Sequence, residues 1–400
     1  MSDRLDATAR RALTGVRAPD ETAAQDRAWT TVRAAYRERP APAPARSRRR
    51  VALAPVVALM IGAIAFSPAG ATVKRIINRA LSTPHVSRAP ALTLPAPGRL
   101  LVSNARGTWV VSSRGAVTRL GAWTQASWSP RAKYLAVASA ARLAAVDPTG
   151  RVAWQLPEHA VSDPRWYWPS GYRVAYRSGT DLREVAGDGR SDHLLATHVA
   201  PIAPAWRPGH DFQVAYVTGH GAVVVRGGDT GAMVWRTGPH PGRPLTLSWS
   251  PAGTRLVVVT SAGAWLYLPG QARPLRVRLP VHGPVLDATA SPDGRWLALV
   301  RGTSEAGGRA GGATAPELQL ADLTAPARPA RTMLSGIAVS QPTWAPDSRW
   351  LLVTWSAADQ WWFVRATGRS RIVAESRVAA KLGAGRRSGA LRLDGWCCGA

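Results

Sequence analysis

Short apolar runs, separated by turns rich in Gly, Pro and polar residues, fill the chain from about residue 99 onward. In the unit that starts at Trp128, three such runs follow one another: YLAVAS, ARLAAVD and RVAWQL. Short apolar runs bounded by turn residues predict β-strands. Because the apolar positions are consecutive rather than alternating, we expect both faces of each sheet to be covered. The pattern therefore predicts an all-β fold made of several small sheets.

One phrase recurs at the head of each unit: an aromatic residue, a Pro within three residues, and then a strand. The six copies read WSPRAKYLAV, WYWPSGYRVAY, WRPGHDFQVAY, WSPAGTRLVVV, ASPDGRWLALV and WAPDSRWLLV, with Ala replacing the aromatic residue in the fifth. Their first residues are 38, 40, 43, 41 and 54 positions apart. A repeat of about 40 residues that holds several strands is typical of a β-propeller blade. The phrase positions to which we assign a structural role are Trp128, Pro130, Trp166, Pro169, Trp206, Pro208, Trp249, Pro251, Pro292, Asp293, Gly294, Trp344, Pro346 and Asp347.

The phrase has a physical logic in this prediction. Residues 291–294 read Ser-Pro-Asp-Gly, a tight-turn sequence in which Pro presets φ and Gly relieves strain at the last position. The aromatic side chain just before the turn can wedge between neighbouring blades and bury about 150–250 Å2 of surface. The phrase also supplies the innermost strand, so that each unit contains the four strands that a blade requires.

The number of blades follows from the two ends of the repeat region. Residues 99–120 contain three short strands without a phrase of their own, and residues 391–396 (LRLDGW) provide a candidate for the missing inner strand. Joining both ends in one blade removes an open sheet edge, which predicts seven blades. The alternative is a six-bladed ring with a loose N-terminal hairpin. A Gly/Ala-rich insertion at residues 303–316 explains the longest interval between phrases.

One apolar segment lies outside the repeats. Residues 51–73 form an uncharged stretch of 23 residues, which is long enough for a transmembrane helix. Residues 31–50 carry seven Arg, against four basic residues in residues 74–93. This asymmetry predicts a cytoplasmic N-terminus and extracytoplasmic repeats in the cell membrane. The alternative is a signal peptide that is cleaved after Ala71.

The chain therefore divides into four parts. Residues 1–50 are a short cytoplasmic helical segment with a Pro/Arg linker, residues 51–73 the transmembrane helix, residues 74–98 a Pro-rich spacer and residues 99–400 the propeller. In the first part, residues 19–38 predict a helix with one narrow apolar stripe. This tail is either weakly ordered or a docking element for a cytoplasmic partner.

The chain is strongly basic, with 51 Lys and Arg against 24 Asp and Glu and a formal net charge of +27. Such a charge favours contact with anionic surfaces such as lipid headgroups and acidic envelope polymers. The basic residues are spread along the chain and do not cluster with stacking aromatic residues, which argues against a nucleic-acid partner. Cys397 and Cys398 are adjacent and can close a strained ring, although an inert pair is the favoured interpretation.

The sequence offers little chemistry. It contains no phosphate-binding loop and no G-x-S-x-G elbow, and its eight His residues are scattered, so we expect no cofactor, no metal and no enzymatic activity. An enzyme would need paired carboxylates in the central cleft of the ring. The residues that could approach a face are Asp163, Asp181, Asp211 and Asp287.

The phrases resemble the WD40-like Pro-Asp repeats of the TolB propeller family. The resemblance covers roughly residues 99–375 and is carried by WSP at Trp128 and Trp249, by SPDG at residues 291–294 and by APDS at residues 345–348. It implies a propeller but no particular activity, since propellers serve many functions. Four of the six copies lack the Asp of the turn. No TolB-type N-terminal domain is recognised, so the lipoprotein partner of TolB is not implied.

The order of a short N-terminal segment, one span and an outer domain is also similar to that of bacterial anti-sigma factors. Residues 1–50 lack the His and Cys of the zinc cluster found in many of them. We therefore expect a membrane-anchored extracytoplasmic propeller that binds a protein or an envelope ligand, with a cytoplasmic segment that makes it a sensor or regulator. The alternatives are an envelope enzyme that uses the central cleft and an inert structural envelope protein.

Overall fold

The computed structural model describes residues 92–268, 271, 273–280, 283–302, 316–384 and 390–398. The predicted helical tail, the predicted span at residues 51–73, most of the spacer and most of the insertion at residues 303–316 lie outside these residues. Within the described ranges, no helix has the length and apolar character needed to cross a bilayer.

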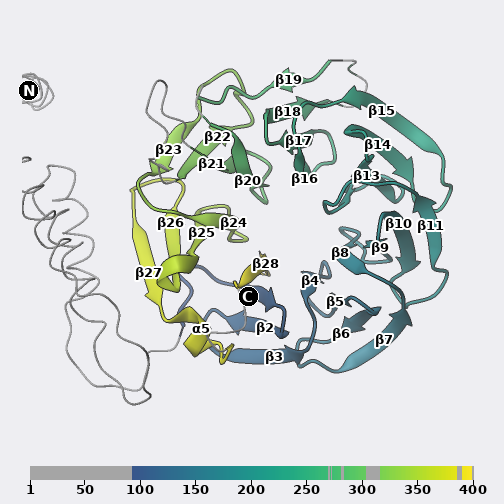
Figure 1. Ribbon diagram of the computed structural model, residues 1–400, viewed down its shortest axis with the longest axis horizontal. Coiled ribbons are helices and arrows are strands. Elements are labelled where there is room, and N and C mark those ends of the chain that lie inside the picture. The colour runs from purple at the N-terminus through teal and green to yellow at the C-terminus, as the bar shows by residue number, and fades with distance from the viewer. Residues whose placement is uncertain are drawn as a thin grey trace, which may run out of the picture. The chain divides into compact units, whose positions relative to one another are not determined.

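Seven four-stranded antiparallel sheets form a ring (Figure 1). Blade 1 contains β28 (Arg392–Cys397), β1 (Arg99–Asn104), β2 (Gly107–Ser112) and β3 (Val117–Gly121). Blade 2 contains β4 (Gln125–Trp128), β5 (Leu135–Ser139), β6 (Arg142–Val146) and β7 (Val152–Pro157). Blade 3 contains β8 (Val161–Trp166), β9 (Arg173–Ser178), β10 (Asp181–Ala186) and β11 (His193–Ala196). Blade 4 contains β12 (Ala205–Trp206), β13 (Gln213–Val217), β14 (Ala222–Gly227) and β15 (Met233–Pro239).

The remaining blades repeat this order from the inner to the outer strand. Blade 5 contains β16 (Pro244–Trp249), β17 (Leu256–Thr260), β18 (Gly263–Tyr267) and β19 (Leu275–Arg276). Blade 6 contains β20 (Val285–Ala290), β21 (Trp296–Arg301), β22 (Glu317–Asp322) and β23 (Arg331–Leu334). Blade 7 contains β24 (Ser340–Trp344), β25 (Trp350–Trp355), β26 (Gln360–Arg365) and β27 (Ile372–Ser376), with the short helices η1 (Ser356–Ala358) and α5 (Val378–Lys381) in its connections.

The two ends of the propeller meet in blade 1. The C-terminal strand β28 pairs antiparallel with β1, and Trp396 lies opposite Leu100. Trp128 and Leu135 are paired in the same way in blade 2, so Trp396 occupies the place of a phrase aromatic. The seven-bladed prediction is confirmed, and the six-bladed alternative is wrong because residues 99–121 complete a blade with the C-terminal strand.

Directly after Trp396, Cys397 and Cys398 form a disulfide with each other. The favoured interpretation of these two residues as an inert pair is therefore wrong.

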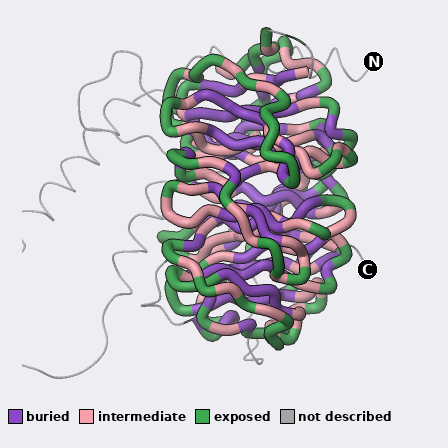
Figure 2. The backbone as a smooth tube through the Cα atoms, turned by 90° about the vertical axis from the view of Figure 1, so that its right-hand side faces the viewer, coloured by how far each residue is buried: buried purple, intermediate pink, exposed green. Residues whose placement is uncertain are grey.

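Each junction between neighbouring blades has its own apolar cluster, and the seven clusters together form the core. The middle strands are buried on both faces: every residue of β17 is buried, as are four of the five residues of β5. The outer strands β7 and β15 instead alternate between half-buried and exposed positions (Figure 2). Consecutive apolar residues thus mark strands that are packed between two blades. Leu92, Leu94 and Ala96 are also buried, at the junction of blades 7 and 1, so the core begins before Arg99.

The phrase tryptophans connect neighbouring blades. Trp128, Trp166, Trp206, Trp249 and Trp344 all contribute to the cluster between their own blade and the preceding one. In three of them the indole N–H also donates a hydrogen bond to the preceding blade. The acceptors are the carbonyl oxygens of Arg165 for Trp206 (2.8 Å), of Ala205 for Trp249 (3.2 Å) and of Thr289 for Trp344 (3.1 Å). Each acceptor residue directly precedes the first residue of its own phrase.

The phrase prolines all lie in the turn between the first two strands of a blade: Pro130, Pro169, Pro208, Pro251, Pro292 and Pro346. In blade 6, Gly294 N–H closes the turn on the Ser291 carbonyl at 2.9 Å, and Gly294 has a φ of 69°. A Cβ at Gly294 would lie 2.7 Å from Cδ of Pro251 in the turn of blade 5. Gly is therefore required at position 294 both by the left-handed backbone and by the close approach of the blade 5 turn. The Asp293 and Asp347 carboxylates each accept the N–H of the residue two positions later.

Candidate functional site

The residue three positions before the first residue of each phrase lies on the innermost strand or just before it. These residues are Gln125, Asp163, Ala203, Thr246, Asp287 and Gln341 in the six phrases, and Leu393 before Trp396 in the closing blade. All except Gln125 line one cavity of about 640 Å3. Because its walls come from the inner strands of blades 1 and 3 to 7 and the loops before them, this cavity belongs to the central channel of the ring.

Bulges bring several of these residues into position. The pairing of the inner strand shifts register in β8 between Ser162 and Arg165, in β24 between Ser340 and Thr343, and also in β16 and β20. A bulge leaves a residue outside the ladder and changes the direction of its side chain. Asp163 lies in the first bulge with a φ of 53°, and Gln341 lies in the second with a φ of 54°. Their N–H groups are therefore available to a neighbouring blade.

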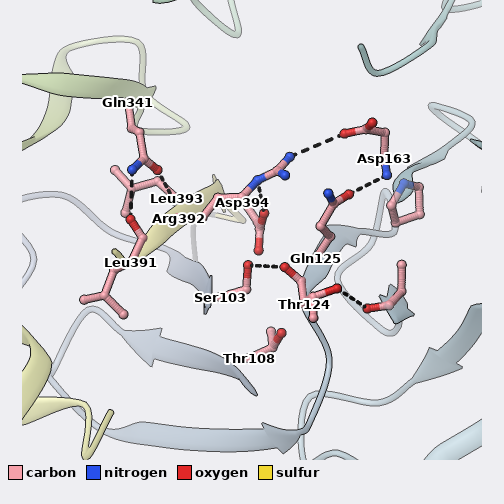
Figure 3. A network of polar contacts seen from close by, with 12 residues as sticks. Ser103, Thr108, Thr124, Gln125, Asp163, Gln341, Leu391, Arg392, Leu393 and Asp394 are labelled. Carbon is pink, nitrogen blue, oxygen red and sulfur yellow. Dashed lines mark hydrogen bonds and ion pairs between the residues drawn. The ribbon is translucent and has the colours of Figure 1, made fainter. Parts of the chain in front are cut away.

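A hydrogen bond repeated at three blade junctions uses these groups. Figure 3 shows two of these bonds, from Asp163 to Gln125 and from Leu393 to Gln341. The N–H of Asp163 donates to Oε1 of Gln125 in blade 2, and the N–H of Gln341 donates to Oδ2 of Asp287 in blade 6 at 3.1 Å. The N–H of Leu393 donates to Oε1 of Gln341 at 2.8 Å, and Nε2 of Gln341 donates to the Leu391 carbonyl at 2.8 Å. We call this repeated bond the channel latch. It links the equivalent positions of successive blades.

A chain of ion pairs crosses the channel between blades 3 and 1. Asp163 pairs with Nη1 of Arg177 at 3.0 Å and with Nη2 of Arg392 at 3.5 Å. Nε of Arg392 in turn lies 3.0 Å from Oδ1 of Asp394, whose side chain is 1% exposed (Figure 3). Burial raises the pKa of Asp394 to about 6, against the opposing effect of Arg392 and Arg165. The closing strand is thereby tied to blade 3 across the channel.

Three further charged residues line the channel. Asp287 accepts the N–H groups of Ala288 and Gln341 at 2.8 and 3.1 Å, and burial raises its pKa. Nη1 of Arg165 donates to the Pro164 carbonyl at 2.8 Å, and burial lowers the pKa of its guanidinium. Within the described part of the chain, neither Arg165 nor Arg243 forms an ion pair with a carboxylate.

The channel contains two of the four acidic residues that the sequence nominated. Asp163 and Asp287 line the cavity, whereas Asp181 begins β10 and Asp211 is exposed in the first turn of blade 4. Among the residues that the structure describes, no three His, Cys, Asp or Glu side chains could together hold a metal ion. The sequence reasoning missed Arg165, Gln341 and Asp394. The fixed offset of three residues from each phrase aromatic would have found Gln341.

A second site lies where the phrase turns of blades 2 and 3 meet. A groove of about 460 Å3 is lined there by Pro130, Arg131, Lys133 and Tyr134 of blade 2 and by Trp166 and residues 170–173 of blade 3. Two aromatic residues of the blade 3 turn are unusually exposed: Trp168 at 52% and Tyr172 at 65%. We call this region the blade 2–3 groove.

No protein-family model and no curated protein matches the chain. Solved structures do match the chain. KlHsv2 with loop 6CD replaced by a Gly-Ser linker superimposes with a TM-score of 0.52 at 12% identity, over 70% of this chain and 95% of that one. The C-terminal WD40 domain of Sif2 superimposes with a TM-score of 0.51 at 11% identity, over 67% of this chain and 78% of that domain. At such low identity the likeness establishes the fold alone: the chain is a WD40-like seven-bladed β-propeller.

Proposed function

We propose that this protein is a membrane-anchored binding module, and that its propeller recognises a protein partner through the blade 2–3 groove. WD40-like propellers generally bind proteins, which supports this class of function. The observation that carries the proposal is the pair of exposed aromatic residues, Trp168 and Tyr172, beside a groove with two exposed cations, Arg131 and Lys133. Trp, Tyr and Arg are the residue types that contribute most to binding energy at protein interfaces.

The turn that carries the two aromatic residues is held by backbone hydrogen bonds at both ends. Tyr167 N–H donates to the Arg173 carbonyl at 2.8 Å, and Gly171 N–H donates to the Tyr167 carbonyl at 2.9 Å. Gly187 N–H also donates to the Tyr172 carbonyl at 2.8 Å. A surface fixed in this way loses little conformational entropy on binding. The turn therefore has the rigidity expected of a recognition element.

The charge of the groove indicates the chemistry of the partner. Arg131 and Lys133 are exposed, whereas the neighbouring Arg173 is already paired with Asp229 at 2.8 Å and with Glu184 at 3.0 Å. Among the described residues neither Arg131 nor Lys133 forms an ion pair, although Lys133 lies over the Tyr134 ring and the exposed Asp188 also lines the groove. Two such cations beside two exposed aromatic rings match a segment that carries acidic residues around an apolar side chain. We therefore propose an acidic protein surface as the partner of this groove.

The membrane anchor and the regulatory role are supported by the sequence. The uncharged residues 51–73 and the seven Arg of residues 31–50 favour one span with the propeller outside the cell. Residues 19–38 would then offer a cytoplasmic docking helix, and the whole chain would act as a sensor or regulator. Alkaline carbonate extraction of membranes tests the anchor: an anchored chain stays in the pellet. The intact mass distinguishes an uncleaved anchor from a chain cleaved after Ala71.

Site-specific crosslinking tests the recognition surface. With a photoreactive benzoylphenylalanine at position 172 of the full chain, we expect one defined crosslinked protein, and we expect W168A/Y172A to weaken binding of that purified protein more than tenfold, or about 1.4 kcal/mol. The control pair is Met233 and Val234 on β15, which are 60% and 49% exposed. Equal crosslinking from positions 172 and 233, or equal affinities of W168A/Y172A and M233A/V234A, would refute the groove.

We propose a binding role rather than catalysis for the channel as well. Each of its carboxylates is already engaged: Asp163 and Asp394 by arginines, and Asp287 by two backbone N–H groups. A catalytic carboxylate must instead reach the proton or the reacting atom of a substrate. The enzyme alternative predicts hydrolysis that the D163N/D287N variant loses, and a screen of envelope polymers with wild-type protein and this variant tests it.

A further inference from the structure

Some of the arginines at the channel are paired with carboxylates, and others are not. Three arginines and three carboxylates line the channel: Arg165, Arg243 and Arg392 against Asp163, Asp287 and Asp394. Arg177, which is not part of the lining, pairs with Asp163. Arg177 and Arg392 are used by Asp163 and Asp394. Arg165 and Arg243 form no ion pair with any described carboxylate. Two guanidinium groups at the cavity are therefore available to an anion.

The wall between these two arginines is uncharged. Arg165 belongs to blade 3 and Arg243 to the loop that enters blade 5, and blade 4 lies between them. Blade 4 contributes Pro201, Ile202 and Ala203 to the cavity. An apolar surface flanked by two cations fits a molecule with an apolar body and an oxyanion. On the other wall, Asp287 and Gln341 bond to backbone groups of the protein itself.

Arg165 is half-buried in the cavity wall and lies within ion-pair distance of no described carboxylate, so its guanidinium can accept an anion as partner. Its guanidinium stays charged, because an Arg side chain cannot lose its proton at accessible pH. A charged group removed from water destabilises the fold unless it is paired and hydrogen-bonded. A ligand oxyanion supplies the missing charge and can accept two parallel N–H donors in a forked arrangement. The volume of about 640 Å3 lies within the usual range of small-molecule sites.

We propose that the central channel binds a small organic oxyanion, a carboxylate or a phosphate ester, with its charged oxygens on Arg165 and its apolar part against Pro201, Ile202 and Ala203. Arg243 is the second cation of this site. The site lies on the channel wall and uses none of the residues of the blade 2–3 groove. It is therefore independent of the proposed protein partner.

Calorimetric titration of the full chain in detergent tests the proposal with three probes that share an apolar ring: benzoate, phenyl phosphate and benzyl alcohol. We expect saturable binding of one of the two anions, which tells a carboxylate ligand from a phosphate ester, and no binding of the uncharged benzyl alcohol. R165Q should weaken the binding about tenfold or more, because it removes both the positive charge and the fork of N–H donors. R165K should retain part of it, since Lys keeps the charge but not the fork.

The matched control is Arg276→Gln on the exposed outer strand β19, which removes the same charge from outside the channel. We expect it to bind like the wild type. Because R165Q alters a half-buried position, its melting temperature is measured alongside. If it does not fold, R243Q, which changes an exposed side chain, takes its place with the same expected direction. The proposal is overturned if neither anion saturates, if R165Q or R243Q binds like the wild type, or if R276Q weakens binding equally.

Discussion

Beside the channel, polar side chains link five consecutive blades of the ring to one another, whereas the described residues of the other two blades lack such links. From blade 6 through 7, 1 and 2 to 3, polar side chains join each blade to the next beside the channel. Three of these bonds join inner strands, from Asp287 to Gln341, from Gln341 to Leu393 and from Gln125 to Asp163, whereas blade 1 reaches the Thr124 carbonyl through Ser103 of its second strand β1. Blades 4 and 5 have Ala203 and Thr246 at the equivalent positions, and no latch is seen between the described residues of these two blades. We call the first region the latched arc and the second the plain arc.

The position of the closing blade explains this difference. Blade 1 is assembled from the two ends of the propeller, so only pairing and packing hold β28 in place. Trp396 is the only apolar residue of β28 that is buried, so apolar burial alone specifies the register of this strand weakly. Gln341 holds β28 at Leu391 and Leu393, and Arg392 ties it to Asp163. The latched arc is centred on the blade that needs this fixation, while the plain arc leaves room for the proposed anion.

The largest effect is expected from the apolar anchor of the closing strand. Trp396 is 5% exposed, packs edge-to-face against Phe363 with ring centroids 5.7 Å apart, and contributes to the cluster of blades 7 and 1. Trp396→Ala should reduce the free energy of unfolding by about 3–5 kcal/mol through lost burial and the cavity left behind. Urea denaturation of the full chain measures this. Val152→Ala on the exposed outer strand β7 is the control and should change stability by less than about 0.5 kcal/mol.

A loss below about 1 kcal/mol for Trp396→Ala would show that β28 is not needed to close the ring. Hydrogen exchange of the Trp396→Ala variant is a second measurement, and it shows whether blade 1 stays closed or frays. Hydrogen exchange should become faster in β28 and β1 before it does so in blades 4 and 5, because local opening begins where the packing has been removed.

Part of the pH dependence of the unfolding free energy should come from Asp394, which lies in the latched arc. Asp394 has a pKa of about 6 in the folded protein, against 3.8 as its ordinary value. A carboxyl group with a raised folded-state pKa contributes stability that is complete below the unfolded value and is lost as the pH rises through the folded value. Wild-type protein should therefore lose on the order of 2–3 kcal/mol between pH 4 and pH 7 from this group.

Asp394→Asn removes that titration, so the difference between variant and wild type should change with pH through this window. Other carboxyl groups with raised pKa values stay in both proteins, and their contributions cancel in this difference: burial raises the pKa of Glu184 to about 7 and also raises the pKa of Asp287. A pH-independent difference in unfolding free energy between the two proteins would contradict the assignment to Asp394.

The latch itself can be compared directly at equivalent positions of the two arcs. Gln341→Ala removes the acceptor of Leu393 N–H and the donor to the Leu391 carbonyl, and should cost about 1–3 kcal/mol because these backbone groups lose their partners. Thr246→Ala changes the corresponding residue of the plain arc, whose hydroxyl has only a 3.5 Å contact with the next carbonyl, and should cost less than about 0.5 kcal/mol. Urea midpoints measure both. Equal losses would mean that the two arcs do not differ in stability.

The fold was predictable from the sequence to a greater extent than the site was. The spacing of Trp128, Trp166 and Trp206 gives the blade repeat, and LRLDGW at residues 391–396 gives the closing strand, because repeats reveal themselves by similarity between copies. The channel depends on the positions where the copies differ. Gln341 and Ala203 occupy the same place in their repeats, and only the ring shows that the former bridges two blades. The partner of Arg392 is 229 positions away at Asp163, a distance that no local pattern encodes.

The smallest expected effect concerns the phrase turns, where blade 6 and blade 5 differ by one residue. Both turns are closed by a Gly N–H on a Ser carbonyl, at 2.9 Å from Gly294 and at 2.8 Å from Gly253. Asp293 of blade 6 also accepts Arg295 N–H at 3.0 Å, whereas blade 5 has the exposed Ala252 at this position. Ala252→Asp should add this bond and stabilise the chain by about 0.5–1 kcal/mol, while Asp293→Ala should cost a similar amount. Because the two turns share one geometry, the two substitutions should shift the urea midpoint in opposite directions, and shifts of the same sign would contradict a stabilising role of the Asp at this position of the turn.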